Sequence, residues 1–438
     1  MDATMSKAQS DEQLEKLAKL SQKRAVWLRV GQLIDGESQS HIADADIVFD
    51  ACQILFAGSQ PAAELLAPGQ SEPDAILPDH TLLPCLIEAH AHLFLDGAPI
   101  NFTNRKQYLT NSNDWMLERA RLRWPKILAT GVGTVRDAGD NRGVGLALAK
   151  EAKTKLGDRS ATPWIDSPGS AIHHQGRYGS FMGEPIEQFE TASDCVAARV
   201  THGADRIKLL VSGIINFKAG RVTAPPQMEP DEVKSLVDAA RIHRRQTFAH
   251  ASGTDGVENA IEGGVDSVEH GFFVTEDQLD RMRDRSIAWV PTFAPVQLQI
   301  DFADQLGWET QIVDHLKRII ECHQQMLGLG HRKGVRILAG SDAGSCGVPH
   351  GVGLLAELSH MERAGLPPMA VLRSATGTSA DTLEFAEQIG QISPGYRSRF
   401  ILTRHDPLDT VANLQKEKTI LFDGAVVTSK GNDDTEGL

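Results

Sequence analysis

Cysteine is scarce in this sequence of 438 residues, and its spacing excludes the usual cysteine-based scaffolds. The five cysteines are Cys52, Cys85, Cys195, Cys322 and Cys346. Their odd number and the lack of any Cys-x-x-Cys pair predict neither a disulfide framework nor a structural zinc site. We therefore expect a protein of the reducing cytoplasm, in which Cys346 packs a loop rather than contacting substrate.

Positive charge is also in deficit, which argues against nucleic acid as a partner. The chain has 44 Lys and Arg against 58 Asp and Glu, a net charge of −14, whereas phosphate binding requires clustered Lys and Arg. No apolar run reaches the length of a membrane span, and residues 1–7 lack the apolar core of a signal peptide. We expect a cytoplasmic protein that binds neither nucleic acid nor a membrane.

Three kinds of segment are present. Residues 1–24 form an N-terminal extension in which Leu14, Leu17 and Leu20 predict a short amphipathic helix or a frayed end. Two terminal segments contain short β-like runs separated by turn signals, and they could pair as one composite unit: residues 25–80 and 392–438. Residues 81–391 alternate strand-like runs with helical stretches such as 230–244 and 311–329, which predicts βα units around a parallel sheet.

Six residues of the kind that bind metals occur in this middle segment, five of them at the ends of short apolar runs. They are His90, His92, Lys208, His250, His270 and Asp342. Short apolar runs flanked by turn residues predict buried strands, and the carboxyl ends of parallel strands are where barrels and open α/β sheets hold catalytic residues. Their order predicts a binuclear metal centre and therefore a hydrolase.

Each of the six has an ordinary structural explanation when it is taken alone. A His-x-His pair on a strand places both imidazoles on one face, because side chains alternate with a period of two, but a polar strand end has the same pattern. Lone buried histidines are more often hydrogen-bonded than metal-bound, and Lys208 alone would be solvated or ion-paired. Asp342, within Gly-Ser-Asp-Ala-Gly, would shape a turn. Only the conjunction of all six favours a metal site.

The segments around these residues resemble the amidohydrolase superfamily over nearly the whole chain. Residues 84–92, Pro-Cys-Leu-Ile-Glu-Ala-His-Ala-His, resemble its first strand, with Cys85 in place of the usual Gly and Glu88 in place of the usual Asp. Four other segments are similar to its fourth, fifth, sixth and eighth strands: residues 205–208, 248–250, 268–270 and 340–344.

Two further segments, residues 134–137 and 348–351, are similar to the branch that contains Xaa-Pro dipeptidases, imidazolonepropionase-like proteins and ochratoxinase. The resemblance implies an α/β fold, namely a (β/α)8 TIM barrel over residues 81–391 and a small β-sandwich built from both ends of the chain. Within the first segment, we expect Arg136 to pair with Asp137, ahead of binding a substrate carboxylate.

The resemblance also implies two divalent metal ions and a modified lysine. Two ligand sets follow from it: His90, His92 and Asp342 for one ion, and His250 and His270 for the other. Lys208 would be carbamylated by CO2 to N6-carboxylysine and bridge the ions. Zinc is the metal we expect, although imidazole and carboxylate ligands also accept Mn, Co or Fe. A metal-bridging hydroxide would attack the amide carbonyl, while Asp342 takes up a proton and returns it to the leaving amine.

Substrate-binding residues are indicated more weakly. The His-His-Gln-Gly-Arg-Tyr-Gly loop corresponds by resemblance to a region that supplies an active-site histidine, for which we choose His174 ahead of His173. Arg177 and Tyr178 could clamp a substrate carboxylate, a task suited to the guanidinium fork, but ordinary surface-loop residues would look the same. His350 would lie over the site or cap the following helix.

Three functions are compatible with these features. The leading one is metal-dependent hydrolysis of an amide bond to an amino acid, in an N-acyl or N-aryl-acyl amino acid or an Xaa-Pro-type dipeptide. The second is hydrolysis of a cyclic amide, lactone, carbamate or phosphotriester on the same binuclear site; a deaminase has less support, because mononuclear deaminases do not need Lys208. The third is a non-catalytic scaffold, which the complete ligand set disfavours. We expect a small-molecule amide or dipeptide as the partner, and a homo-oligomer.

Overall fold

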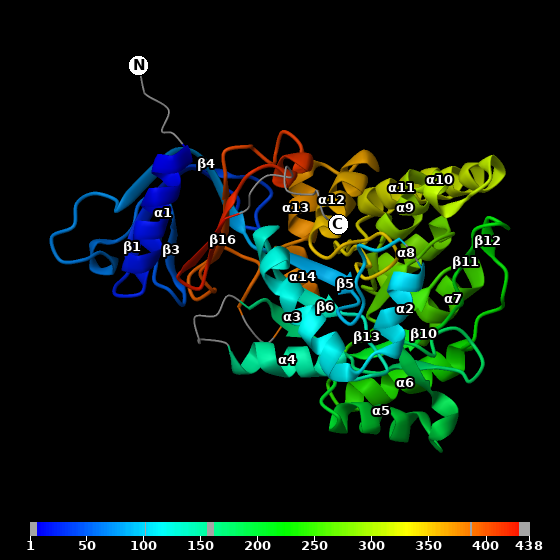
Figure 1. The fold of residues 1–438 in the computed structure, drawn as a ribbon. Coiled ribbons are helices and arrows are strands. Elements are labelled where there is room, and N and C mark those ends of the chain that lie inside the picture. The colour runs from blue at the N-terminus through cyan, green and yellow to red at the C-terminus, as the bar shows by residue number, and fades with distance from the viewer. Residues whose placement is uncertain (1–6, 101, 156–161, 386–387, 429–438) are drawn as a thin grey trace.

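The computed structural model describes residues 7–100, 102–155, 162–385 and 388–428. Two expected segments extend beyond these residues, at the start of the N-terminal extension (1–6) and at the end of the composite β unit (429–438). A mainly antiparallel sheet lies beside a larger group of parallel strands and helices (Figure 1). No helix in the described part of the chain is long and apolar enough to cross a membrane.

Both ends of the chain contribute strands to one seven-stranded sheet, in the order β18-β17-β16-β4-β1-β2-β3. Its strands are β1 (Val26–Leu33), β2 (Ile42–Phe49), β3 (Ile54–Gly58), β4 (Ala75–Pro84), β16 (Arg399–Thr403), β17 (Thr419–Phe422) and β18 (Ala425–Thr428). β16 pairs antiparallel with β4, with Phe400 opposite Pro84. The pairing of the two ends is thus confirmed, whereas their arrangement as a sandwich stays a prediction. Because β4 continues to Pro84, the sheet extends past the boundary expected at residue 80.

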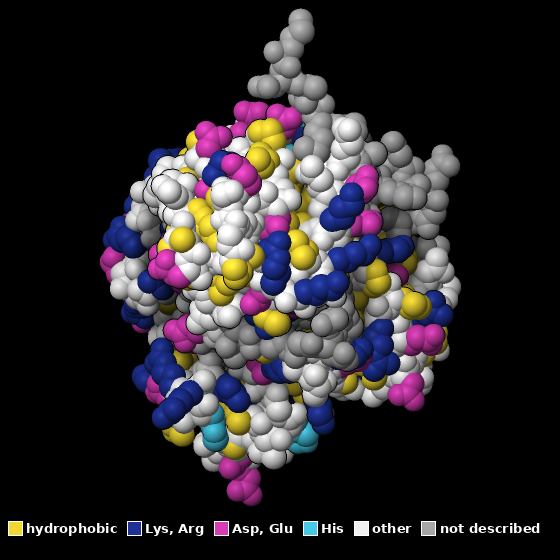
Figure 2. All heavy atoms as spheres, turned by 90° about the vertical axis from the view of Figure 1, so that its left-hand side faces the viewer, with side chains coloured by type: hydrophobic (Ala, Val, Ile, Leu, Met, Phe, Trp, Pro, Cys, Tyr) yellow, Lys and Arg dark blue, Asp and Glu magenta, His cyan; other side chains and the backbone are white. Residues whose placement is uncertain are grey.

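The N-terminal extension forms a helix, α1 (Lys7–Ser21), that packs on this sheet. Leu14, Leu17 and Ala18 are buried against strand residues such as Leu28 and Phe400. Burial of this apolar stripe is what holds the helix, since a 15-residue helix is marginal by itself in water. The face of the molecule on this side mixes cationic and anionic side chains without a large patch of one sign among the described residues (Figure 2).

The parallel strands fall into two hydrogen-bonded groups, β5-β6-β7 and β15-β14-β13-β10-β8-β9. Their bounds are β5 (Leu86–Ala91), β6 (Val132–Asp137), β7 (Trp164–Asp166), β8 (Ala171–His173), β9 (Gly183–Pro185), β10 (Ile207–Leu210), β13 (Thr247–Ala251), β14 (Ser267–His270) and β15 (Ala288–Val290). A separate hairpin follows β10 and consists of β11 (Ile215–Asn216) and β12 (Arg221–Val222).

Residues 336–343 connect the two groups of parallel strands. Ile337 forms a bridge with Trp289 of β15, and Ala343 forms a bridge with Ala91 of β5. The segment therefore lies where the strand before Asp342 was expected, but isolated bridges replace a continuous strand. This interruption leaves the backbone free to turn, and Asp342 itself has a φ of 54°.

Helices separate the parallel strands along the chain and enclose a shared apolar core. They are α2 (Phe102–Thr110), α3 (Asn113–Ala129), α4 (Val144–Thr154), α5 (Ala192–Thr201), α6 (Pro230–Ile242), α7 (Thr254–Gly263), α8 (Glu276–Asp284), α9 (Ala294–Asp301), α10 (Ala303–Leu306), α11 (Thr310–Lys333), α12 (Val352–Arg363), α13 (Pro368–Ser374) and α14 (Gly377–Leu383). The helices predicted over 230–244 and 311–329 are confirmed as α6 and α11.

α6 shows why these segments are helical. It begins with Pro230 in its first turn, a position where the missing N–H costs nothing. Val233, Leu236, Val237 and Ala240 are buried at the i, i+3, i+4 and i+7 spacing of one helix face. That face packs on the core, and the loop between β10 and α6 borders the site.

Candidate metal centre

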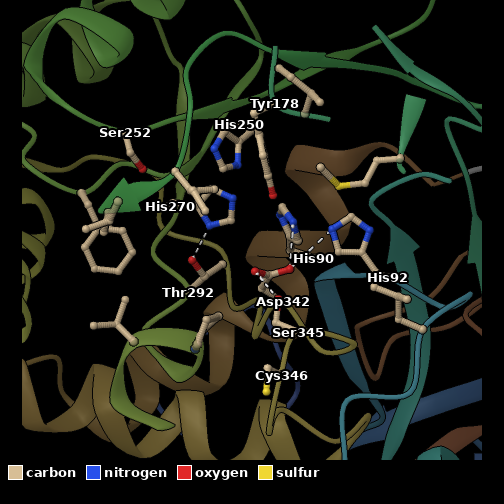
Figure 3. A pocket seen from close by; sticks show the side chains of 18 of the residues that line it. His90, His92, Tyr178, His250, Ser252, His270, Thr292, Asp342, Ser345 and Cys346 are labelled. Atoms are coloured by element: carbon tan, nitrogen blue, oxygen red, sulfur yellow. Dashed lines mark hydrogen bonds and ion pairs between the residues drawn. The ribbon is translucent and has the colours of Figure 1, made fainter. Parts of the chain in front are cut away.

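Four histidines meet in one buried cavity (Figure 3). His90 lies on β5 and His92 directly follows it, while His250 lies on β13 and His270 ends β14. Successive ring centroids are 5.7 Å apart from His92 to His90, 5.0 Å from His90 to His270 and 4.5 Å from His270 to His250. Burial lowers the pKa of all four, to about 3 for His92 and His250. The rings are therefore neutral near pH 7, the state in which imidazole binds a metal.

Each of these rings uses one nitrogen in a hydrogen bond away from its neighbours and keeps the other nitrogen available. The four contacts are His90 Nδ1 to Glu269 Oε2 at 2.5 Å, His92 Nδ1 to the Gly139 carbonyl at 3.1 Å, His250 Nε2 to the Gly213 carbonyl at 3.3 Å and His270 Nδ1 to Thr292 Oγ1 at 2.7 Å. Such outer contacts fix the tautomer and orientation of metal-binding histidines. The arrangement favours binding through Nε2 of three rings and Nδ1 of His250.

Asp342 directs one carboxylate oxygen at the His-x-His pair. Its Oδ2 accepts a hydrogen bond from Ser345 Oγ at 2.9 Å. Its Oδ1 lies 3.6 Å from His90 Nε2 and 3.5 Å from His92 Nε2 and has no hydrogen-bond partner among the described residues. Burial raises the pKa of Asp342 to about 7, although the hydrogen bond from Ser345 opposes this shift. Asp342 can therefore both bind a cation and exchange a proton near neutral pH.

Lys208 is the second residue of β10 rather than its last, because the strand continues to Leu210. The side chain is buried, and Nζ lies 4.6 Å from the ring centroid of Phe248 without a hydrogen-bond partner in the described structure. Burial lowers the pKa of Lys208 to about 8, although the negative charge of Glu269 acts the other way. A fraction of the amine is therefore neutral at pH 7–8, as a reaction with CO2 requires.

These observations fit a metal centre. His90, His92 and Asp342 offer ligand atoms that all lie within 4.8 Å of one another. Lys208 Nζ and Asp342 Oδ1 are buried polar atoms without hydrogen-bond partners among the residues that the structure describes, which is costly unless a ligand or water satisfies them. Neutral imidazoles and a carboxylate are the donor set that divalent zinc and similar ions prefer.

Arg136 contacts the histidine site indirectly, through Glu269, and its partner differs from the predicted one. Its Nη2 donates to both carboxylate oxygens of Glu269 at 2.9 Å, and its guanidinium stacks on the ring of Phe248 at 4.4 Å. The predicted pairing of Arg136 with Asp137 is wrong, because neighbouring residues of a strand point to opposite faces. Asp137 instead accepts a hydrogen bond from Ser167 Oγ at 2.7 Å.

Glu88 ties the first histidine strand to the segment that carries Asp342. Its Oε1 accepts hydrogen bonds from the backbone N–H of Ser341 at 2.8 Å and of His90 at 3.1 Å, and its Oε2 accepts one from Ser341 Oγ at 2.6 Å. The acidic residue at this position thus sets the spacing between the His-x-His pair and Asp342.

The cavity above the histidines has a volume of about 360 Å³ and is mostly apolar. Its apolar wall consists of Leu95, Tyr178, Phe181, Met182, Leu210, Ile214, Ile215, Phe217, Phe272, Pro295 and Val296. Its polar residues, apart from the six predicted metal ligands, are Arg105, Ser252, Thr292, Gln299, Ser345 and Cys346. A volume within the range of roughly 300–1,000 Å³ suits a small-molecule ligand.

Of the predicted substrate-binding residues, the structure brings Tyr178 to the cavity. Its ring lies 5.2 Å from that of His250 and reaches toward the other imidazoles (Figure 3). Cys346 lines the cavity, but its Sγ contacts the backbone carbonyls of Pro99 and Ile100, which agrees with a packing role.

The other predicted residues do not line the cavity. His174 is held between two carboxylates, with Nδ1 2.7 Å from Glu187 and Nε2 2.9 Å from Glu232. His173 is buried, with Nδ1 2.7 Å from the His174 carbonyl. The exposed Arg177 donates to the carbonyls of Pro225 and Pro226.

His350 neither covers the site nor caps a helix by its side chain. It is buried, with Nε2 3.1 Å from the backbone carbonyl of His92. Helix α12 follows with Gly351 at its N-cap and no side-chain cap.

The sequence interpretation missed Glu269, Thr292, Ser345 and Arg105. A signal existed for Glu269, because a charged residue inside an apolar strand must find a partner when it is buried. Thr292 and Ser345 follow strand ends without a distinctive motif. Arg105 belongs to an ordinary polar helix, α2, and nothing in its sequence context points to the cavity.

Sequence comparison places the chain near known hydrolases. A profile of the amidohydrolase family matches residues 81–427. Ochratoxinase from Aspergillus niger is 25% identical over 280 residues, which cover 63% of this chain and 57% of that protein. The chain thus spans little more than half the length of that relative. An uncharacterized protein from Mycobacterium tuberculosis is 24% identical over 305 residues, covering 69% of this chain and 74% of that one.

Solved structures with similar folds include a dipeptidase and ochratoxinase. A Xaa-Pro dipeptidase with bound methionine superposes with a TM-score of 0.76 at 24% identity, covering 93% of this chain and 100% of that one. The A. niger ochratoxinase superposes with a TM-score of 0.76 at 21% identity, covering 93% and 96%. At these identities the likeness shows the fold.

Proposed function

The chain belongs to the amidohydrolase family, and from this premise we propose that it is a metal-dependent hydrolase of an amide bond to an amino acid. The substrate class is N-acyl or N-aryl-acyl amino acids or Xaa-Pro-type dipeptides. The observation that carries the proposal is the convergence of four neutral imidazoles with Asp342 Oδ1 and Lys208 Nζ, two buried atoms that have no hydrogen-bond partner in the described part of the chain.

We assign the ligands in two sets. His90, His92 and Asp342 hold one divalent ion, as their mutual distances support. The other ion belongs to His250 and His270, whose rings lie 4.5 Å apart. Lys208, once carbamylated at Nζ, would be a shared ligand of the two ions. When bound, such a pair of ions acidifies a water molecule and polarises the scissile carbonyl.

The chain's own residues handle the proton. Asp342 takes up a proton from the attacking water and returns it to the leaving amine. Ser345 holds Oδ2 and so keeps Oδ1 turned toward the histidines. The apolar side chains that line the cavity lower the polarity around the buried histidines, which strengthens the electrostatic interactions there.

The fold that we propose for this chemistry is the complete (β/α)8 barrel. The bridges of residues 336–343 to β15 and β5 support it, because an eighth strand that closes a barrel must contact both groups of parallel strands. The carboxyl ends of the strands then surround a single cavity, where barrel enzymes hold their catalytic residues.

Metal content per chain tests the centre. We expect about two ions in the wild type with bicarbonate present, and one or none in Lys208→Ala. Lys418→Ala is the matched control, because Lys418 is also buried with its pKa lowered to about 8 but lies beside β17, outside the cavity. Equal metal content in Lys208→Ala and wild type would show that Lys208 has only a structural role.

Hydrolysis of a substrate panel tests the reaction. We expect the metal-loaded enzyme to cleave N-acyl amino acids or Xaa-Pro dipeptides faster than neutral cyclic amides, lactones, carbamates or phosphotriesters. Faster turnover of the neutral compounds would shift the function to the second class, and a metal-loaded protein that cleaves none of them would contradict the proposal.

A further inference from the structure

The cavity contains one guanidinium, and it is not the one that the sequence indicated. We propose that Arg105 binds the free carboxylate of an N-acyl amino acid whose bulky apolar group packs on the apolar side chains that line the cavity. This inference rests on the proposed hydrolase function and specifies its substrate. Apart from Lys208, which we assign to the metal centre, Arg105 is the single Lys or Arg among the described residues that line the cavity.

Two backbone carbonyls hold Arg105 close to the metal ligands. Its Nη1 donates to the carbonyl of Asp96 at 3.3 Å, and its Nη2 donates to the carbonyl of Gly344 at 3.2 Å. Asp96 lies in the loop that follows His92, and Gly344 lies in the loop that follows Asp342. The guanidinium on α2 is therefore fixed between the two loops that carry the first ligand set.

The charge of Arg105 is available to a ligand. A guanidinium has five N–H donors, and the two carbonyls take two of them, which leaves three. No carboxylate in the described structure forms an ion pair with it, whereas the buried Arg136 is paired with Glu269. A half-buried, unpaired guanidinium in a mostly apolar cavity attracts an anion, and its planar fork matches a carboxylate.

The apolar side chains of the cavity select for a different part of the substrate, a bulky apolar group. Phe181, Phe217 and Phe272 line the cavity together with Ile214, which is 55% exposed although large and apolar. Phe217 is further supported by Trp308, with ring centroids 6.3 Å apart. Aromatic and aliphatic side chains around one cation suit a substrate with a single carboxylate and a bulky apolar or aromatic group.

Arg177 offers no comparable site. Its guanidinium also donates to two carbonyls, but it is exposed and lies outside the cavity lining. Arg177→Ala is therefore the matched comparison for Arg105→Ala, because both substitutions remove a guanidinium with two backbone contacts.

The experiment compares N-benzoyl-L-phenylalanine with N-(2-phenylethyl)benzamide, which has the same scissile bond without the carboxylate. Wild type, Arg105→Ala, Arg105→Lys and Arg177→Ala are assayed with metal loaded, after thermal unfolding has shown that each is folded. We expect Arg105→Ala to lower kcat/KM for the acid by about 30-fold, mainly through KM, because one charge-assisted contact is lost. The neutral amide should change less than 3-fold, and Arg105→Lys should retain part of the preference.

Equal losses on both compounds would show that Arg105 only positions the two loops, and an acid-specific loss in Arg177→Ala instead would return the role to Arg177. Either result overturns the inference. If the wild type cleaves neither compound, the wider substrate panel decides the hydrolase proposal separately, and calorimetric binding of N-benzoyl-L-phenylalanine decides the role of Arg105. Binding that weakens about 30-fold in Arg105→Ala alone supports Arg105, and binding that is absent or unchanged overturns it.

Discussion

Glu269 Oε2 lies 2.5 Å from Nδ1 of His90, although the two residues are 179 positions apart in the sequence. The contact crosses from β14 to β5 and orients the Nε2 of His90 toward Asp342. Glu269 is fully buried and is also paired with Arg136. One carboxylate therefore positions a metal-type ligand and neutralises a buried guanidinium.

Replacing Glu269 with Gln should harm both stability and metal binding. The substitution leaves the Arg136 guanidinium buried without its counter-charge, which should destabilise the metal-free protein by about 3–5 kcal/mol. Metal affinity should fall roughly 10- to 100-fold, because the one neutral amide oxygen of Gln is a weaker acceptor for His90 than the carboxylate that orients it. Urea unfolding and competition with a chelator measure the two effects. Glu12→Gln, on the exposed face of α1, is the control and should change neither stability nor metal affinity. An unaltered unfolding midpoint in Glu269→Gln would contradict the role of Glu269 as the counter-charge of Arg136.

Substitutions of Asp342 should separate backbone conformation from chemistry. Its φ of 54° is tolerated by Asp and Asn but costs Ala about 1–2 kcal/mol. We expect Asp342→Asn to lower kcat by about 100-fold or more, because the amide cannot take up the proton. Asp342→Ala should lose activity similarly and be less stable than Asp342→Asn by the conformational cost. Steady-state kinetics and urea unfolding check this, and a fully active Asp342→Asn would exclude Asp342 as the proton carrier.

Acid should destabilise the protein through His323, a core histidine far from the solvent. The ring stacks on Phe272 with centroids 4.0 Å apart, and its Nε2 donates to the Pro291 carbonyl at 2.9 Å. Burial lowers the pKa of His323 from 6.5 to about 4. The unfolded chain therefore takes up a proton below pH 6.5 that the folded protein does not, and this stability is lost as the pH falls from 6.5 to 4. The slope is about 1.4 kcal/mol per pH unit for this one group.

His323→Gln should remove that part of the slope when the free energy of unfolding is measured by urea at pH 5 and pH 7. Phe293→Leu is the matched control, because Phe293 packs on His323 with ring centroids 4.7 Å apart but does not titrate. Phe293→Leu should lower the free energy of unfolding by the same amount at pH 5 and at pH 7. An identical slope in wild type and His323→Gln would refute the contribution of His323.

The sequence by itself determined the features that depend on local periodicity. Alternation along a strand places His90 and His92 on one face, and their Nε2 atoms do lie at almost equal distances from Asp342. Helical spacing predicted α6 and α11, and the pattern of leucines predicted either a short helix or a frayed end where α1 lies. Six residues of metal-binding type, each near the end of an expected strand, come together in one cavity. These features require only that strands repeat every two residues, that helices repeat every 3.6 and that parallel strands share an edge.

The tertiary structure alone decided which distant residues became neighbours. Arg136 pairs with Glu269 rather than with the adjacent Asp137, since the partner comes from another strand. Arg105 reaches the cavity and Arg177 does not, because the placement of α2 and the course of the loop after β8 decide which side chain faces inward. Strand register and loop conformation depend on the packing of the whole core, and no local sequence pattern specifies them.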